Sequence, residues 1–270
     1  MIRTKNLYQT FIIAIISSAL LLGCKKEKNT DDTLAASNEV SFMVAEKSFS
    51  DDIEHITKSG LIDTNCSGEG FIASCVTVTD SGEGVYPRTI VLDYGDGCEG
   101  PGGNIRSGTI LISLTNDMSQ VGATRTVTFQ DFALNNKQLV GSRITTRLEN
   151  TANGEPQFAR SIDMTISYIG TIERHFTENI VWTSGYDTEA CGDNVFTITG
   201  SGYVIRPNGV VVNRTISVPL VRDFICGYTV SGVITIDAPN GIRIIDFGNG
   251  TCDDEATVLF NGNTTTIVLH

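Results

Sequence analysis

Asp163-Met164-Thr165-Ile166-Ser167-Tyr168 alternates apolar and polar residues, the pattern of a β-strand with one face in a core and the other in water. Thr109-Ile110-Leu111-Ile112-Ser113-Leu114 and Val195-Phe196-Thr197-Ile198-Thr199 share this short, β-branched character. Residues 89–92 and 126–129 repeat it elsewhere in the chain. The region after residue 70 is therefore predicted to consist of half-buried strands.

Turn signals separate these strands. Asn-Gly pairs, which supply the positive φ angles of two-residue hairpins, begin at positions 153, 208, 240, 249 and 261. Asn135-Asn136 separates two further apolar runs, and Pro219 and Pro239 are expected near strand ends. With about a dozen candidate strands and no long helix between them, the predicted fold class is all-β. We expect a large antiparallel sheet, either a sandwich or one meander curled onto itself.

The N-terminus carries an export and lipidation signal. Arg3 and Lys5 precede an apolar core that ends at Gly23, which predicts a signal peptide over residues 1–23. Leu21-Leu22-Gly23-Cys24 resembles the lipobox of bacterial lipoproteins, and this resemblance implies that Cys24 carries the lipid. Several acyl chains, at about 0.8 kcal/mol per buried methylene, would hold the protein in a bilayer. An export signal without lipidation is the alternative.

Residues 24–37 combine the lipidated cysteine with a polar stretch that is predicted to be a flexible tether. A lysine at position 25, rather than an aspartate, resembles the outer-membrane sorting pattern of lipoproteins. We therefore expect a cell-envelope protein at the outer membrane, facing either the periplasm or the outside. Its expected partners are the lipid bilayer, through acylated Cys24, and an unidentified envelope or extracellular molecule.

Two further parts come after the tether. Residues 38–62 are predicted to be helical, since apolar residues recur there at roughly helical spacing and Gly60 comes after them. These apolar residues are Val40, Met43, Val44, Phe49, Ile53 and Ile56. Residues 63–270 contain no composition shift or long linker, which predicts a single antiparallel β domain. The helical segment is expected to cover one face or one end of this domain.

The charge balance is acidic. The chain has a formal net charge of −12, and removing Arg3 and Lys5 with the signal peptide makes it −14. Such a charge repels phosphate backbones, and the sequence has no basic patch with interleaved aromatic residues, so nucleic-acid binding is not expected. The acidity fits either a solvated surface or the binding of cations.

Six of the seven cysteines remain for disulfides once Cys24 is lipidated. An internal repeat suggests how four of them pair. Its first copy is Asp93-Tyr94-Gly95-Asp96-Gly97-Cys98, and its second copy is Asp246-Phe247-Gly248-Asn249-Gly250-Thr251-Cys252. One further cysteine precedes each copy, Cys75 before the first and Cys226 before the second. A hairpin in each copy would bring its two cysteines together. We predict Cys75–Cys98 and Cys226–Cys252, each contributing about 2 to 4 kcal/mol, and by elimination Cys66–Cys191.

The repeat and its surroundings resemble a family of secreted lipoproteins of Gram-negative bacteria. The similarity rests on residues 87–98, Gly100-Pro101, 106–110, 219–222, 246–253 and 258–269. It spans most of residues 66–270, without Cys66 and Cys191. The resemblance implies the fold and the location and brings no activity, cofactor or site.

Candidate site residues fall into three groups. Trp182 and Tyr186 are candidates for stacking on sugar rings, with packing on a sheet face as the alternative. Asp93, Asp96, Glu99 and Asp246 are weak candidates for calcium, although their spacing departs from known calcium loops and an Asp that caps backbone amides is the simpler interpretation. Among the histidines, His175 is either an exposed residue on the polar face of a strand or part of a functional site. His55 and His270 do not indicate a site.

No catalytic motif is present in the sequence, and no catalytic residue is assigned. The first functional hypothesis is a non-enzymatic envelope lipoprotein whose disulfide-stapled β domain acts as a structural or binding module, without a cofactor. The second is a lectin-like or calcium-assisted ligand-binding protein. The third is an acid–base hydrolase, which requires two carboxylates to meet in an open cleft.

Overall fold

The computed structural model describes residues 75–82, 84–100, 103–167, 170–188, 192–226 and 228–269. These residues form fourteen strands of one sheet. The strands are β1 (Thr77–Asp80), β2 (Arg88–Asp93), β3 (Cys98–Glu99), β4 (Ile105–Leu114), β5 (Thr124–Leu134), β6 (Lys137–Arg147), β7 (Gln157–Ser167), β8 (Thr171–Ser184), β9 (Val195–Ile205), β10 (Val211–Asp223), β11 (Thr229–Ala238), β12 (Gly241–Asn249), β13 (Glu255–Phe260) and β14 (Asn263–Val268). The predicted all-β class is confirmed.

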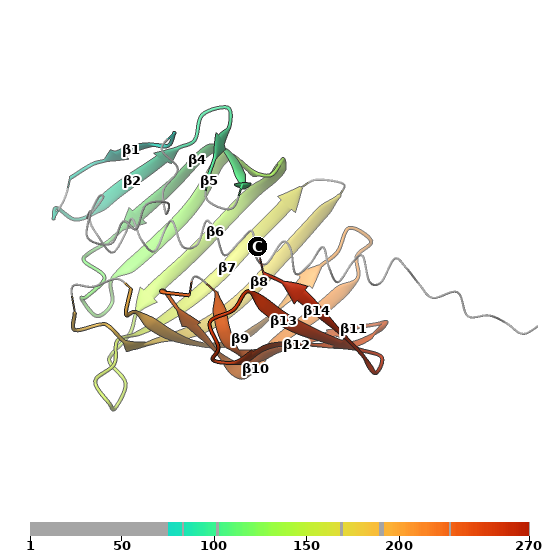
Figure 1. Cartoon of the computed structure of the whole chain (residues 1–270). Coiled ribbons are helices and arrows are strands. Elements are labelled where there is room, and N and C mark those ends of the chain that lie inside the picture. Colours follow the sequence, from blue (N-terminus) through green and yellow to red (C-terminus); the bar gives the residue numbers. More distant parts are fainter. Residues whose placement is uncertain are drawn as a thin grey trace, which may run out of the picture.

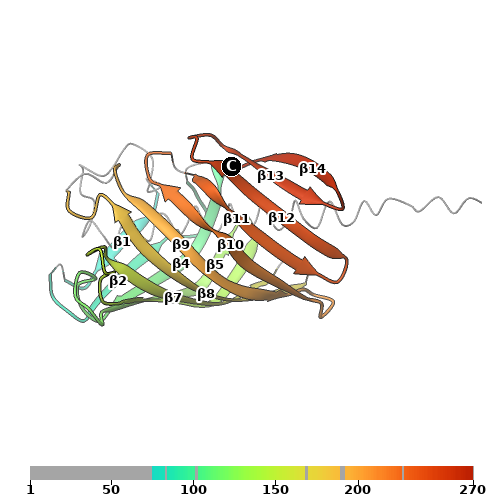
Figure 2. The same cartoon turned by 90° about the horizontal axis from the view of Figure 1, so that it is seen from below.

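The order of the strands in space follows their order in the chain. Each strand from β1 to β14 pairs antiparallel with the next, except that the short β3 pairs with β4 beside the main path. Of the two predicted arrangements, the structure has the single curled meander. Figures 1 and 2 show how β9 to β14 turn out of the plane of β1 to β8, so that the open sheet is curved.

Several of the turns predicted from the sequence are found in the structure. Asn135 and Asn136, with φ angles of 49° and 62°, connect β5 to β6. Pro239 lies in the turn between β11 and β12, as expected. The expectation for Pro219 is wrong, because it lies inside β10 where the register with β11 shifts between Val218 and Val221. A bulge tolerates proline because the ladder hydrogen bond is already interrupted there.

One face of the sheet is buried, and we call it the inner face. The register aligns its apolar side chains across the strands, as in the row Ile90, Ile112 and Val127 and in the pair Ile234 and Ile245. These side chains form two apolar clusters, one from β2 to β9 and one from β10 to β13. The opposite, outer face carries the polar residues of the alternating pattern.

The inner face also carries most of the arginines. Ten of the twelve arginines in the chain occupy inner-face register positions. They are Arg88, Arg106, Arg125, Arg143, Arg147, Arg160, Arg174, Arg214, Arg222 and Arg243. Arg106 is fully buried and Arg243 is 1% exposed. Long guanidinium side chains are rarely so buried, so this face combines apolar and cationic character.

Both disulfides predicted from the repeat are confirmed. Cys75 is bonded to Cys98, and Cys226 to Cys252, at sequence separations of 23 and 26 residues. In each copy the hairpin lies between the two cysteines: β1 pairs with β2, and β11 pairs with β12. The predicted Cys66–Cys191 pair lies outside the described residues.

A buried ion pair joins β1 to β2. The Arg88 guanidinium donates from Nε to both carboxylate oxygens of Asp80 at 3.0 Å, and its Nη2 contacts Oδ2 as well. The two side chains are 4% and 6% exposed. The hydrogen bonds from Arg88, assisted by the backbone amide of Gly82, lower the pKa of the Asp80 carboxyl.

Asp80→Asn is expected to destabilise the protein by about 3 kcal/mol at pH 7, because it leaves a buried guanidinium without its carboxylate. The pKa of Asp80 is lower in the folded than in the unfolded state. The pair therefore contributes fully above about pH 4 and loses its contribution as the pH falls through the folded-state pKa. In urea unfolding between pH 7 and pH 2.5, the difference in the free energy of unfolding between the variant and the wild type should shrink as the pH falls. Asp237→Asn, at an exposed position of β11, is the control, and a gap that does not depend on pH would contradict the assignment.

Candidate ligand-binding site

Aromatic side chains gather at one end of the inner face, where β8 meets β9. Trp182 of β8 pairs with Phe196 of β9, and their rings stack with centroids 5.4 Å apart. Tyr186, in the turn after β8, meets Trp182 edge to face at 6.4 Å. The two sequence-predicted candidates are thus neighbours, and Tyr186 remains 39% exposed.

The next strand extends this cluster with a cation. Arg222 of β10 pairs with Phe196, and its guanidinium lies 5.2 Å from the centre of the Phe224 ring. Phe224 in turn lies 5.5 Å from Phe196. Burial lowers the pKa of Arg222 to about 10, so the guanidinium still carries its charge at neutral pH. We call Trp182, Tyr186, Phe196, Arg222 and Phe224 together the aromatic rim.

The loop between β8 and β9 is held against the rim by polar contacts. Gly185 begins it with a φ of 77°, a conformation that glycine adopts without strain. The Thr188 hydroxyl donates to Asp193 at 2.8 Å. Asn194 is fully buried, and its backbone oxygen accepts a hydrogen bond of 3.0 Å from the amide of Phe224. These contacts join the loop to the end of β10.

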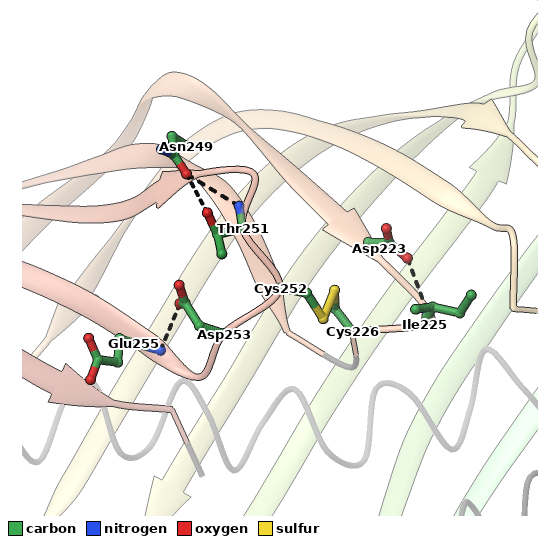
Figure 3. The surroundings of a disulfide bond; sticks show 8 residues. All are labelled: Asp223, Ile225, Cys226, Asn249, Thr251, Cys252, Asp253 and Glu255. Atoms are coloured by element: carbon green, nitrogen blue, oxygen red, sulfur yellow. Dashed lines mark hydrogen bonds between the residues drawn. A yellow bond between two sulfur atoms is a disulfide. The ribbon is translucent and has the colours of Figure 1, made fainter.

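A disulfide lies just after β10, the strand that carries Arg222, and Figure 3 shows its surroundings. Cys226 follows β10 and is bonded to Cys252, which lies in the loop after β12. The Asp223 carboxylate accepts from the amide of Ile225 at 3.0 Å and turns the chain after the strand. Ile225, which directly precedes Cys226, is 76% exposed. The bridge therefore ties the segment that follows Arg222 and Phe224 to the loop after β12.

The rim has the chemistry of a recognition site for a molecule with both a flat apolar face and an acidic group. Aromatic rings provide flat contact area at a low cost in side-chain entropy, and a tyrosine hydroxyl can donate and accept hydrogen bonds. A guanidinium prefers carboxylate or phosphate because its donors match the spacing of two oxygens. Ring and guanidinium side by side can thus bind an acidic sugar.

The calcium candidates have another task in the structure. The Asp93 carboxylate accepts from the amide of Gly95 at 2.9 Å, and Asp246 contacts Gly248 in the same way at 2.9 Å. In the first copy this contact forms the capped turn that was the simpler interpretation, whereas in the second copy Asp246 and Gly248 lie inside β12, where the register with β11 shifts. Asp96 and Glu99 are exposed nearby. No group of three or more potential metal ligands occurs within the described residues.

His175 lies on the outer face of β8, partly exposed. Its Nδ1 is 2.6 Å from Oδ1 of Asp163, and its Nε2 is 3.8 Å from the Glu173 carboxylate. The ring stacks on Tyr203 at 4.8 Å. The Asp163 and Glu173 carboxylates thus both lie near one histidine on the outer face of the sheet.

Several predicted features lie outside the described residues. They are the signal peptide, Cys24, the tether, the segment 38–62, His55, Cys66, Cys191 and His270. Within the part of the chain that is described, there is no helix long and apolar enough to cross a membrane. Comparisons of the chain with protein-family models, with curated proteins and with solved structures found no match.

Three members of the rim were missed by sequence reasoning. Arg222 and Phe224 lie far from Trp182 in the chain, and the pairing of β8 with β9 and of β9 with β10 brings them to Phe196 and Trp182. One signal was available. Phe196 belongs to a predicted strand that follows closely after Trp182, which made a hairpin between them the simplest arrangement.

Proposed function

We propose that this protein is a non-enzymatic, lipid-anchored binding module of the cell envelope, and that its aromatic rim binds carbohydrates that carry carboxylates. The observation that supports this proposal is the cluster in which Phe196 lies between Trp182 and Arg222, with Tyr186 against Trp182, at the end of a disulfide-supported sheet. Rings would pack against the apolar face of a sugar, and the guanidinium would pair with its acid. The lipid on Cys24 would keep the rim close to the membrane surface.

Tyr186→Ala is expected to weaken binding of polygalacturonate oligomers about tenfold, which corresponds to about 1.4 kcal/mol from one lost ring contact. Titration calorimetry with these oligomers, and with dextran oligomers of similar length as a neutral probe, measures this effect. The melting temperature of the variant should stay within a few degrees of the wild type, because the side chain is 39% exposed.

Tyr203→Ala is the matched control, since Tyr203 is equally exposed, at 39%, but lies on the outer face. It should leave binding unchanged. Equal losses in both variants, or no binding of either oligomer by the wild type, would reject the rim as a sugar site. Turnover of glycan, ester or peptide substrates that His175→Ala abolishes would instead show that the module is an enzyme.

A further inference from the structure

The described strands supply far more positive than negative charge to the inner face. Asp80 and Glu178 are the two carboxylates at inner-face strand positions, and each lies against an arginine. Asp80 binds Arg88, and Glu178 lies 3.4 Å from Arg160. Ten arginines thus share this face with two acids, in a chain whose net charge is −12. A surface of this composition is complementary to an acidic partner.

The same face is also apolar, and its arginines lie on rings. Arg174 and Arg214 both lie over Phe176, at 5.3 and 5.1 Å from the ring centre. Gly202 makes room for this contact, because a Cβ there would come within 2.4 Å of the Phe176 ring. Arg243 lies 4.2 Å from the centre of the Phe260 ring. An occupant of this face needs apolar side chains and carboxylates on one and the same side.

Residues 38–62 have that combination. In a helix, Phe42, Phe49, Ile53 and Ile56 would fall on one stripe, because successive members are seven, four and three residues apart. Glu46 and Asp52 lie three residues on either side of Phe49 and belong to the same stripe. The segment carries five carboxylates and two lysines in all. A helix that packs on a purely apolar sheet would not be expected to carry acids within its apolar stripe. A helix that packs on a face with buried arginines would, because the acids can pair with the guanidinium groups.

The segment also has a suitable length and attachment. A helix of 25 residues is about 37 Å long, and a strand of 11 residues, such as β5, β6 or β7, spans about 36 Å. The 12 residues 63–74 can span up to about 40 Å between the segment and Cys75, where the disulfide to Cys98 fixes the chain. The segment can therefore reach the middle strands of the inner face.

We propose that residues 38–62 dock as an amphipathic helix on the inner face of the sheet, with Glu46 and Asp52 facing its arginines and Phe49, Ile53 and Ile56 packed among its apolar side chains. The helix forms the second layer of the domain. An isolated helix with this sequence would be marginal in water, so the sheet holds it in place.

Hydrogen exchange of the full lipidated protein in detergent micelles tests the docking. Amides of residues 38–62 should exchange at least tenfold more slowly than those of residues 25–37. The double variant Glu46→Gln/Asp52→Asn removes the two stripe acids and should reduce this protection at least fivefold. Asp51→Asn/Glu54→Gln removes two acids outside the stripe and should change it less than twofold. Exchange of 38–62 as fast as the tether, or equal effects of the two double variants, would overturn the proposal.

A photo-reactive p-benzoylphenylalanine at position 49 tests which face is used, and needs no substitution in the sheet. The expected product is a crosslink within one chain to peptides that carry the inner-face residues Met164 or Phe176. No crosslink, or a crosslink between two chains, would contradict docking of the segment on its own sheet.

Discussion

Cys24→Ala is expected to abolish the incorporation of labelled palmitate and to move the protein from the membrane pellet to the soluble fraction. The sulfur of Cys24 is the proposed attachment point of the lipid, and alanine offers no nucleophile. Each acyl chain contributes about 0.8 kcal/mol per buried methylene, so two or more chains hold a protein stably while none leaves it free. The effect should therefore be all or none.

Thr30→Ala, in the predicted tether, is the control and should label and sediment like the wild type. The melting temperature of the β domain should be the same in both variants, because position 24 lies well before β1. Palmitate labelling that persists in Cys24→Ala would exclude this cysteine as the lipidated residue.

Protease digestion of intact cells, compared with lysed cells, tests on which side of the outer membrane the domain of the proposed lipoprotein lies. Digestion of the wild type on intact cells would place the aromatic rim outside, where it meets external glycans. Protection until lysis would place it in the periplasm, and acidic glycans of the envelope would become the ligands to test first.

Phe132→Ala is expected to destabilise the protein by about 4 kcal/mol, the largest effect of a single core truncation that we foresee. The Phe132 side chain is fully buried in the first apolar cluster. Its ring meets Tyr94 edge to face at 5.8 Å and Phe129 at 5.5 Å. Truncation would leave a cavity, and Tyr94 belongs to the turn that leads to the Cys75–Cys98 bridge, so the surroundings have little freedom to collapse into it.

Urea unfolding at pH 7 measures the effect, and Phe129→Ala on the same strand is the matched control. Phe129 is partly buried at the margin of the same cluster, and its truncation should cost about half as much. Equal losses in the two variants would show that Phe132 does not hold the central place in the core that its burial indicates.

The strands themselves could be predicted from local patterns. Residues 109–114 lie within β4 and residues 195–199 within β9, because side chains that alternate along the chain also alternate across a strand. The hairpin at Asn135 and Asn136 was equally local, since two adjacent asparagines suit the two positive φ angles of the turn. Pro219 was misplaced, because a bulge inside a strand has no signature in the sequence around it.

The disulfides could be predicted for a different reason. Each pair closes a hairpin, so that one local turn and a repeated motif were enough to place Cys75 opposite Cys98 and Cys226 opposite Cys252. The candidate calcium residues show the opposite case. The sequence allowed Asp93 and Asp246 to bind either a cation or a backbone amide, and the position of the Gly95 and Gly248 amides shows the second contact.

By itself, the sequence determined the period of the strands, their turns, the two hairpin disulfides and the antiparallel class, because each depends on residues close together in the chain. The tertiary structure alone decided that the sheet is one curled meander, that ten arginines share its inner face, and that Phe196 lies between Trp182 and Arg222. These features depend on the register between strands. A shift of one residue moves every side chain to the opposite face, and no short stretch of sequence specifies that register.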